Sequence, residues 1–107
     1  MSDSRAYFDV LSQDCCSTHA DVAEGKMMSS PGLKVKGKIF AFYHKSAMGF
    51  RLGPQFDPEL FGISAWEPLS PFKTKPPLAG WLMVKEQEKK EWENLITLSL
   101  EYTRTLA

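Results

Sequence analysis

Cys15 and His19 are the residues of this 107-residue sequence whose types and spacing could do chemistry. Four positions apart on a helix, they share one face, where an imidazole can polarise a thiol or both side chains can hold a metal ion. Cys15 also falls on the apolar stripe of its segment, where a free cysteine commonly behaves as a small hydrophobic residue. Cys16 follows directly, and a redox-sensing disulfide between such neighbours is disfavoured by helical geometry. We therefore expect no metal and no cofactor, with a thiol redox or small-molecule function as the less favoured alternative.

Catalytic motifs are missing from the rest of the sequence. The second histidine, His44, closes a predicted strand beside Lys45 and is expected to be an exposed turn residue. The sequence contains no Gly-x-Ser-x-Gly elbow, phosphate-binding glycine loop or Gly-x-Gly-x-x-Gly fingerprint. Acidic residues are plentiful, but none forms a constellation that the sequence can single out. We therefore expect that the chain is not an enzyme.

The charges are segregated along the chain, although 13 basic and 13 acidic residues give a net charge of zero. Residues 1–24 carry a net charge of −4, residues 25–56 carry six bases and no acid, and residues 57–107 carry −2. A basic sheet surface of this kind attracts an acidic protein or nucleic acid, although strand-edge lysines also deter aggregation. The candidate partner-binding residues are Lys34, Lys36, Lys38, Tyr43 and Arg51.

A protein partner is favoured over nucleic acid as the ligand of this surface. Modules that bind nucleic acid combine positive charge with several stacking aromatic side chains. Tyr43 is the single aromatic that the strand pattern places on the outer face among these lysines. Direct, mainly electrostatic binding of nucleic acid through residues 25–56 remains the alternative.

Helices are expected at both ends of the chain. Phe8, Leu11 and Cys15 recur at helical spacing in a segment from about Ser4 to Ala20, so Cys15 faces the core and Cys16 lies nearer the flank. A second helix is expected from about Glu86 to Leu106. Its apolar side holds six residues: Trp92, Leu95, Ile96, Ser99, Tyr102 and Leu106.

Strands are expected between these helices. Residues 33–35 and 38–43 form a predicted hairpin with a two-residue turn at Lys36-Gly37, which requires positive φ at Lys36. In this register Val35 pairs with Lys38 and Leu33 with Phe40. One face then carries Leu33, Val35, Phe40 and Phe42, and the other carries Lys34, Ile39, Ala41 and Tyr43.

Further strands are predicted at residues 22–28, 48–52 and 79–84. The strand at 48–52 points Met48, Phe50 and Leu52 inward and Arg51 outward. Between the last two strands, Asp57 and Pro58 predict a capped short helix in which Phe56 packs on Phe61. The proline-rich residues 67–78 are expected to form an ordered surface loop.

This order of elements predicts an α+β fold. We expect one two-layer domain over residues 1–107, with a largely antiparallel sheet of about five strands and both terminal helices on one face. The 13 aromatic residues and zero net charge exclude disorder as the dominant state, and no run without a polar residue approaches the length that spans a membrane. Absence of a secretory signal and of separated cysteines favours a cytoplasmic location.

Residues 24–107 resemble the TfoX (Sxy) N-terminal-domain family and, more distantly, YjbR-like proteins. The similar residues are Lys26-Met27-Met28, Gly32–Ala41, Met48–Leu52, Ala79–Val84 and the helix Trp92–Leu106. The Phe-Gly-Gly turn of that family is replaced here by Met28-Ser29-Ser30-Pro31-Gly32, and full-length members continue into a second, helical domain.

The resemblance implies a regulatory function without catalytic residues. Full-length members of the family regulate natural competence together with the cyclic-AMP receptor protein at promoters. The expected function of this chain is therefore a non-enzymatic regulatory or protein-interaction domain with a transcription-related protein partner.

Overall fold

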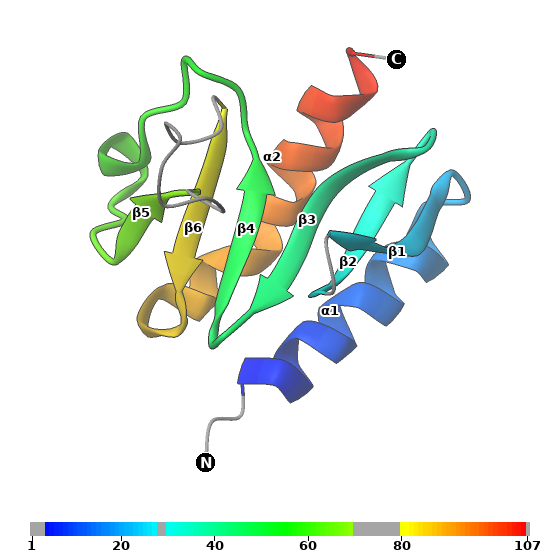
Figure 1. Ribbon diagram of the computed structural model, residues 1–107, viewed down its shortest axis with the longest axis horizontal. Coiled ribbons are helices and arrows are strands. Elements are labelled where there is room, and N and C mark those ends of the chain that lie inside the picture. The colour runs from blue at the N-terminus through cyan, green and yellow to red at the C-terminus, as the bar shows by residue number, and fades with distance from the viewer. Residues whose placement is uncertain (1–3, 28–29, 70–79, 107) are drawn as a thin grey trace.

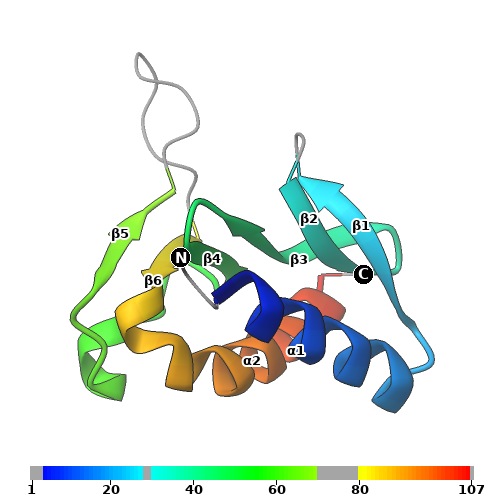
Figure 2. The ribbon, with the colours of Figure 1, turned by 90° about the horizontal axis from the view of Figure 1, so that it is seen from below.

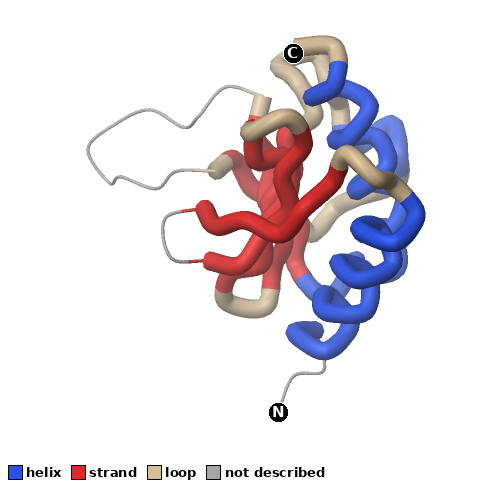
Figure 3. The backbone as a smooth tube through the Cα atoms, turned by 90° about the vertical axis from the view of Figure 1, so that its right-hand side faces the viewer, coloured by secondary structure: helices blue, strands red, loops and turns tan. Residues whose placement is uncertain are grey.

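The computed structural model describes residues 4–27, 30–69 and 80–106. Its two main helices, α1 (Ser4–Thr18) and α2 (Trp92–Arg104), both cover one face of an antiparallel sheet (Figures 1 and 2). The six strands, in the spatial order β1-β2-β3-β4-β6-β5, are β1 (Val22–Met27), β2 (Ser30–Val35), β3 (Lys38–His44), β4 (Ala47–Arg51), β5 (Trp66–Pro68) and β6 (Trp81–Lys85). The predicted two-layer α+β fold with helices on one face is thus confirmed, as the separation of helices and strands in Figure 3 also shows.

The core lies between the helices and the sheet. Helix α1 contributes Phe8, Leu11 and Cys15, as its three- and four-residue spacing predicted. Helix α2 places Trp92 at the centre of the layer, fully buried, with its indole Nε1 donating to the carbonyl of Val84 at 3.2 Å. Burying an indole costs free energy unless its N–H finds an acceptor, so this bond makes the tryptophan compatible with the core.

The buried face of α2 differs from the predicted stripe at its C-terminal end. Leu95, Ile96 and Ser99 are buried, but Leu100 and Thr103 complete the stripe, whereas Leu106 is 41% exposed. The helix ends at Arg104, so Leu106 no longer follows the helical period. A six-residue 3-10 helix, Glu86–Glu91, precedes α2 where a continuous helix was predicted.

The turn between β2 and β3 forms at Lys36-Gly37, and Val35 pairs with Lys38, as predicted. Both turn residues have positive φ, 51° at Lys36 and 79° at Gly37, which is the conformation of a type I′ turn. The β3–β4 turn repeats this geometry at Lys45 and Ser46, with φ of 47° and 64°. Non-glycine residues thus bear the strain of positive φ in both turns.

An irregularity in β3 changes the predicted faces of the hairpin. Leu33 pairs with Ala41 and Lys34 with Ile39, so Phe40 is the extra residue between two paired positions. Because a bulge shifts the alternation by one residue, Phe40 and Ala41 both reach the helix layer. The predicted Leu33–Phe40 pair is therefore wrong, and Phe42 lies on the outer face instead of in the core with Leu33.

The sixth strand and the short helix complete the far side of the sheet. β5 was not predicted; it pairs with β6 through three residues at the sheet edge. The short helix Pro58–Phe61 is a 3-10 helix with the predicted cap, in which Asp57 Oδ1 accepts from Glu59 N at 3.0 Å. Phe56 stacks on Phe61 with ring centroids 4.9 Å apart, as predicted. The loop predicted over residues 67–78 falls mostly outside the described residues.

Candidate interaction surface

Four of the five predicted partner-binding residues lie at the same end of the sheet. Lys34 is near the end of β2, Lys36 occupies the turn, Lys38 begins β3, and Arg51 ends β4. Because these strands are antiparallel, these positions meet at the end of the sheet that carries the β2–β3 turn, at the top of Figure 1. We call these four residues the basic end.

The basic end extends around the edge of the sheet rather than over one flat face. Lys34 pairs with Ile39 and projects outward, away from the helices. Lys38 lies opposite the buried Val35 and therefore on the helix side of the hairpin, at its exposed tip. Lys34, Lys36 and Lys38 are exposed and Arg51 is half-buried. A ligand that contacts all four must therefore wrap around the end of the sheet.

The positive charge of the basic end is not neutralised within the described residues. None of its four side chains forms an ion pair with a described carboxylate. The ion pairs among the described residues involve other cations and join Arg5 to Asp9, Lys85 to Glu67 and Arg104 to Asp21. Asp21 precedes β1 at this same end of the sheet. Its carboxylate is engaged by Arg104 and is thus not available to neutralise the lysines.

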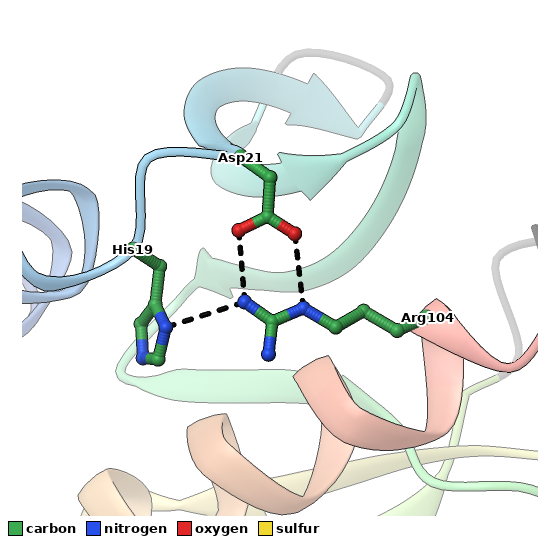
Figure 4. A network of polar contacts seen from close by, with 3 residues as sticks. All are labelled: His19, Asp21 and Arg104. Atoms are coloured by element: carbon green, nitrogen blue, oxygen red, sulfur yellow. Dashed lines mark hydrogen bonds and ion pairs between the residues drawn. The ribbon is translucent and has the colours of Figure 1, made fainter.

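The contact between Asp21 and Arg104 joins the end of α2 to the turn between α1 and β1 (Figure 4). Arg104 donates through Nε at 3.0 Å and through Nη2 at 2.8 Å to the two oxygens of Asp21. Nη2 also donates to Nδ1 of His19 at 3.2 Å. Hydrogen bonds from the guanidinium hold the pKa of Asp21 below its usual value, because they favour the charged carboxylate.

The structure corrects the position of Tyr43. The strand pattern placed its ring on the outer face, but the bulge at Phe40 turns it toward the helices. The ring packs against Phe8 at 5.6 Å, and its hydroxyl shares a 2.8 Å hydrogen bond with Ser4. Tyr43 therefore belongs to the interface between α1 and the sheet, and we exclude it from the basic end.

The outer face carries other aromatic residues that the sequence analysis missed. Phe42 and Trp81 contact each other with ring centroids 5.6 Å apart, beside Met83. Trp81 is the cross-strand partner of Arg51 and is half-buried, whereas Phe42 is only 2% exposed. Leu82 and Val84 lie in the core, and side chains alternate along a strand. This alternation in residues 81–84 could have predicted that Trp81 lies on the outer face.

Gly49 allows the Phe42 ring to lie flat on the outer face. A Cβ atom at Gly49 would overlap Cε1 and Cζ of Phe42 and come within 3.0 Å of the Met83 sulfur. Gly49 and Phe42 are also direct cross-strand partners. The aromatic ring of Phe42 is therefore covered by its neighbours and is not presented for stacking.

The candidate thiol site contains a buried cysteine that packs in the core. Cys15 is 7% exposed, and burial, the larger cause, raises its pKa to about 11. The pKa of Cys16 is also raised, mainly by burial and to a smaller extent by the nearby negative charge of Glu24. Cys15 and His19 line a common cavity of about 210 Å³ between α1 and α2, although α1 ends at Thr18, one residue before His19. No group of three or more metal-ligating side chains occurs in the described part of the chain.

His44 hydrogen bonds through Nδ1 to the hydroxyl of Ser30, 2.9 Å away. A hydroxyl activated for nucleophilic attack needs an imidazole that a third group holds in place. Among residues 4–27, 30–69 and 80–106, no carboxylate forms a hydrogen bond to His44. The pair links β2 to the end of β3 and lacks that third group.

Comparison with known proteins finds no matching family model, no matching curated protein and no matching solved structure. None of the helices among the described residues is long and apolar enough to span a membrane.

Proposed function

We propose that this chain is a non-enzymatic interaction domain that binds an acidic protein through the basic end. The observation that carries this proposal is the convergence of Lys34, Lys36, Lys38 and Arg51 at one end of the sheet, without ion pairs to described carboxylates. Unneutralised cations grouped in this way steer and select a partner of opposite charge. The resemblance to TfoX N-terminal domains supports a transcription-related protein as that partner and a cytoplasmic location.

The burial of the outer-face aromatics favours a protein over single-stranded nucleic acid. Non-specific nucleic-acid platforms expose several rings on which successive bases stack. Here Phe42 is buried, Tyr43 faces the helices, and Trp81 beside Arg51 is half-buried. The adjacency of Trp81 and Arg51 supports electrostatic nucleic-acid binding as the second candidate function.

The test uses two variants with the same net charge. K34E/R51E reverses two charges of the basic end, whereas K89E/K90E reverses two exposed charges on the 3-10 helix before α2. The original chain and each variant are used as bait in lysate with and without nuclease treatment. The protein that the original chain retains is then purified, and its affinity for all three chains is measured. We expect K34E/R51E to weaken binding at least about tenfold and K89E/K90E to leave it within about twofold, because only the first places acids against an acidic partner.

The nucleic-acid alternative is measured on the same proteins. Anisotropy of a labelled 20-nucleotide single strand is followed between 50 and 200 mM salt. If the basic end neutralised four phosphates, the affinity would fall roughly 50-fold over this range. That result, together with loss of lysate binding after nuclease treatment, would replace the protein partner by nucleic acid. Equal effects of the two charge-reversal variants would instead rule out the basic end for either ligand.

A further inference from the structure

The two edges of the sheet differ in how well they are protected. β5 has three residues and ends in Pro68, which has no backbone N–H to donate. Short strands and prolines are the devices by which proteins prevent edge-to-edge pairing. β1 at the opposite edge has six residues, no proline and an uninterrupted register with β2. No described strand pairs with its other side.

The side chains of β1 carry one acid and one base on the same face. Val22 packs in the core, so Glu24 and Lys26 also point to the helix side of the strand. Gly25 faces the opposite way, since a Cβ there would meet Ile39 and Lys34 on the outer face. Glu24 and Lys26 are both exposed, and neither forms an ion pair with another described residue.

Helix α1 leaves this edge accessible. Glu24 and Lys26 line an open groove of about 380 Å³ between the β1–β2 hairpin and α1, with Arg5 and Asp9 on the helix wall. Arg5 and Asp9 pair with each other at 3.1 Å. The charges of the helix wall therefore satisfy each other, and those of β1 are left for another partner. Figure 2 shows β1 as the outermost strand above α1.

A second copy of the chain satisfies these charges in a single register. Directly opposite residues of an antiparallel pair share a face, so a two-fold axis perpendicular to the sheet must pass midway between the two copies of one β1 residue. An axis at Glu24 opposes two carboxylates, and an axis at Lys26 opposes two ammonium groups. An axis at Gly25 opposes Glu24 with Lys26 twice, Ala23 with Met27 twice, and two glycines at the centre.

We propose that the chain forms a two-fold symmetric dimer by antiparallel pairing of β1 with β1, centred on Gly25. The two sheets become one continuous sheet with all four long helices on one face. Both basic ends then belong to a single particle. A five-residue backbone overlap is smaller than a standard protein interface, so we expect a reversible dimer with a Kd on the order of 100 µM.

The test is sedimentation of the full chain between about 10 µM and 1 mM. E24K places two ammonium groups opposite each other on both sides of the central Gly25, and K26E places two carboxylates there, so each single variant should raise Kd at least about tenfold. The double variant E24K/K26E restores opposite charges and should return Kd to within about threefold of the original. An equimolar mixture of the two single variants should form a heterodimer.

A charge change elsewhere supplies the control. E93K reverses an exposed acid on α2 with the same change in net charge as E24K, and should leave Kd within about twofold. A chain that sediments at its 12.1 kDa monomer mass up to 1 mM would overturn the proposal. A dimer that E24K does not weaken, or that the double variant does not restore, would also overturn it.

This inference is independent of the proposed function. K34E/R51E changes no residue of β1, although Lys34 pairs with Ala23 of that strand. Binding to a partner is therefore tested at micromolar concentrations, where the chain is monomeric. Each proposal has its own variants and its own readout. Failure of the dimer would therefore leave the test of the basic end unaffected, and loss of partner binding would not weaken the dimer.

Discussion

At the scale of single residues, burial rather than spacing determines what the thiols can do. Cys15 lies on α1 and His19 directly follows its last residue, Thr18, and the two side chains line one cavity. The imidazole, however, accepts a hydrogen bond from Arg104 through Nδ1. The thiol is enclosed in the core, where the uncharged form is favoured. A reactive cysteine needs the opposite environment, one that is partly exposed and electropositive.

We expect Cys15 to be nearly inert toward alkylation in the folded protein. With a pKa of about 11 in place of the ordinary 9.0, roughly one Cys15 thiol in a thousand is ionised at pH 8, against about a tenth of unfolded thiols. In a Cys16→Ser variant burial, the largest cause of the raised pKa, remains, so iodoacetamide should modify Cys15 at least about tenfold more slowly without urea than with it. The Cys15→Ser variant reports Cys16 separately. Rapid alkylation of Cys15 in the folded chain would revive the thiol-chemistry alternative.

At the scale of elements, a long-range ion pair joins the end of α2 to the turn between α1 and β1. Arg104 is the last residue of α2, and Asp21 lies between α1 and β1. The contact therefore positions the turn from which β1 begins. Sequence reasoning had no signal for it, because the two residues are 83 positions apart. Only the packing of both helices on one sheet face brings them together.

The Asp21 contact makes stability depend on pH in acid solution. The folded-state pKa of Asp21 lies below its unfolded value, so its contribution is present at neutral pH and is lost as the pH falls through the folded-state pKa. An NMR titration of the Asp21 carboxyl should show this depressed pKa. In Arg104→Gln it should rise toward the ordinary value of about 3.9.

Arg5→Gln is the control for this titration, since it removes the exposed Arg5–Asp9 pair and leaves Asp21 untouched. An Asp21 pKa that is the same in Arg104→Gln and in the original chain would show that the guanidinium contact is not formed in solution.

At the scale of the whole molecule, folding converts a charge pattern along the chain into one in space. Helix α1 has one base and two acids, and α2 has the same balance. The strands and turns from residue 25 to 56 contain no acid. Helices and strands occupy separate layers (Figure 3). Within the sheet, the antiparallel register brings Lys34, Lys36, Lys38 and Arg51 to one end, where their positive charges lie together. The positive and negative charges are thus unevenly distributed over the molecule, although its net charge is zero.

This separation predicts that the protein is retained on a resin whose charge has the same sign as the protein's own net charge. At pH 8, above the pI of about 6.7, the chain should still bind a sulfonate cation exchanger at low salt through the basic end. K34E/R51E should pass unretained, whereas K89E/K90E should elute near the original salt concentration. Equal loss of retention in both variants would show that binding follows net charge alone.

Short-range features of this protein were accessible from its sequence. The turn at Lys36-Gly37, the Asp57 cap, the Phe56–Phe61 contact and the inward residues of α1 each depend on residues close together in the chain. Local backbone geometry decides such features, and residue type reports it directly. The α+β order of elements followed from the same local patterns.

Features that depend on pairing between distant segments became visible only in the folded chain. The bulge at Phe40 arises because Leu33 pairs with Ala41 and Lys34 with Ile39. It places Tyr43 on the helix side of the sheet and Phe42 on the outer face. Strand β5 exists because β6 pairs with it. The charge run of residues 25–56 was visible in the sequence, but its convergence on one end of the sheet required antiparallel strands in a particular register. Residue order alone thus specified which side chains were available to each element. Several alignments of two strands allow similar backbone hydrogen bonds. The burial of apolar side chains across the whole core determines which alignment forms.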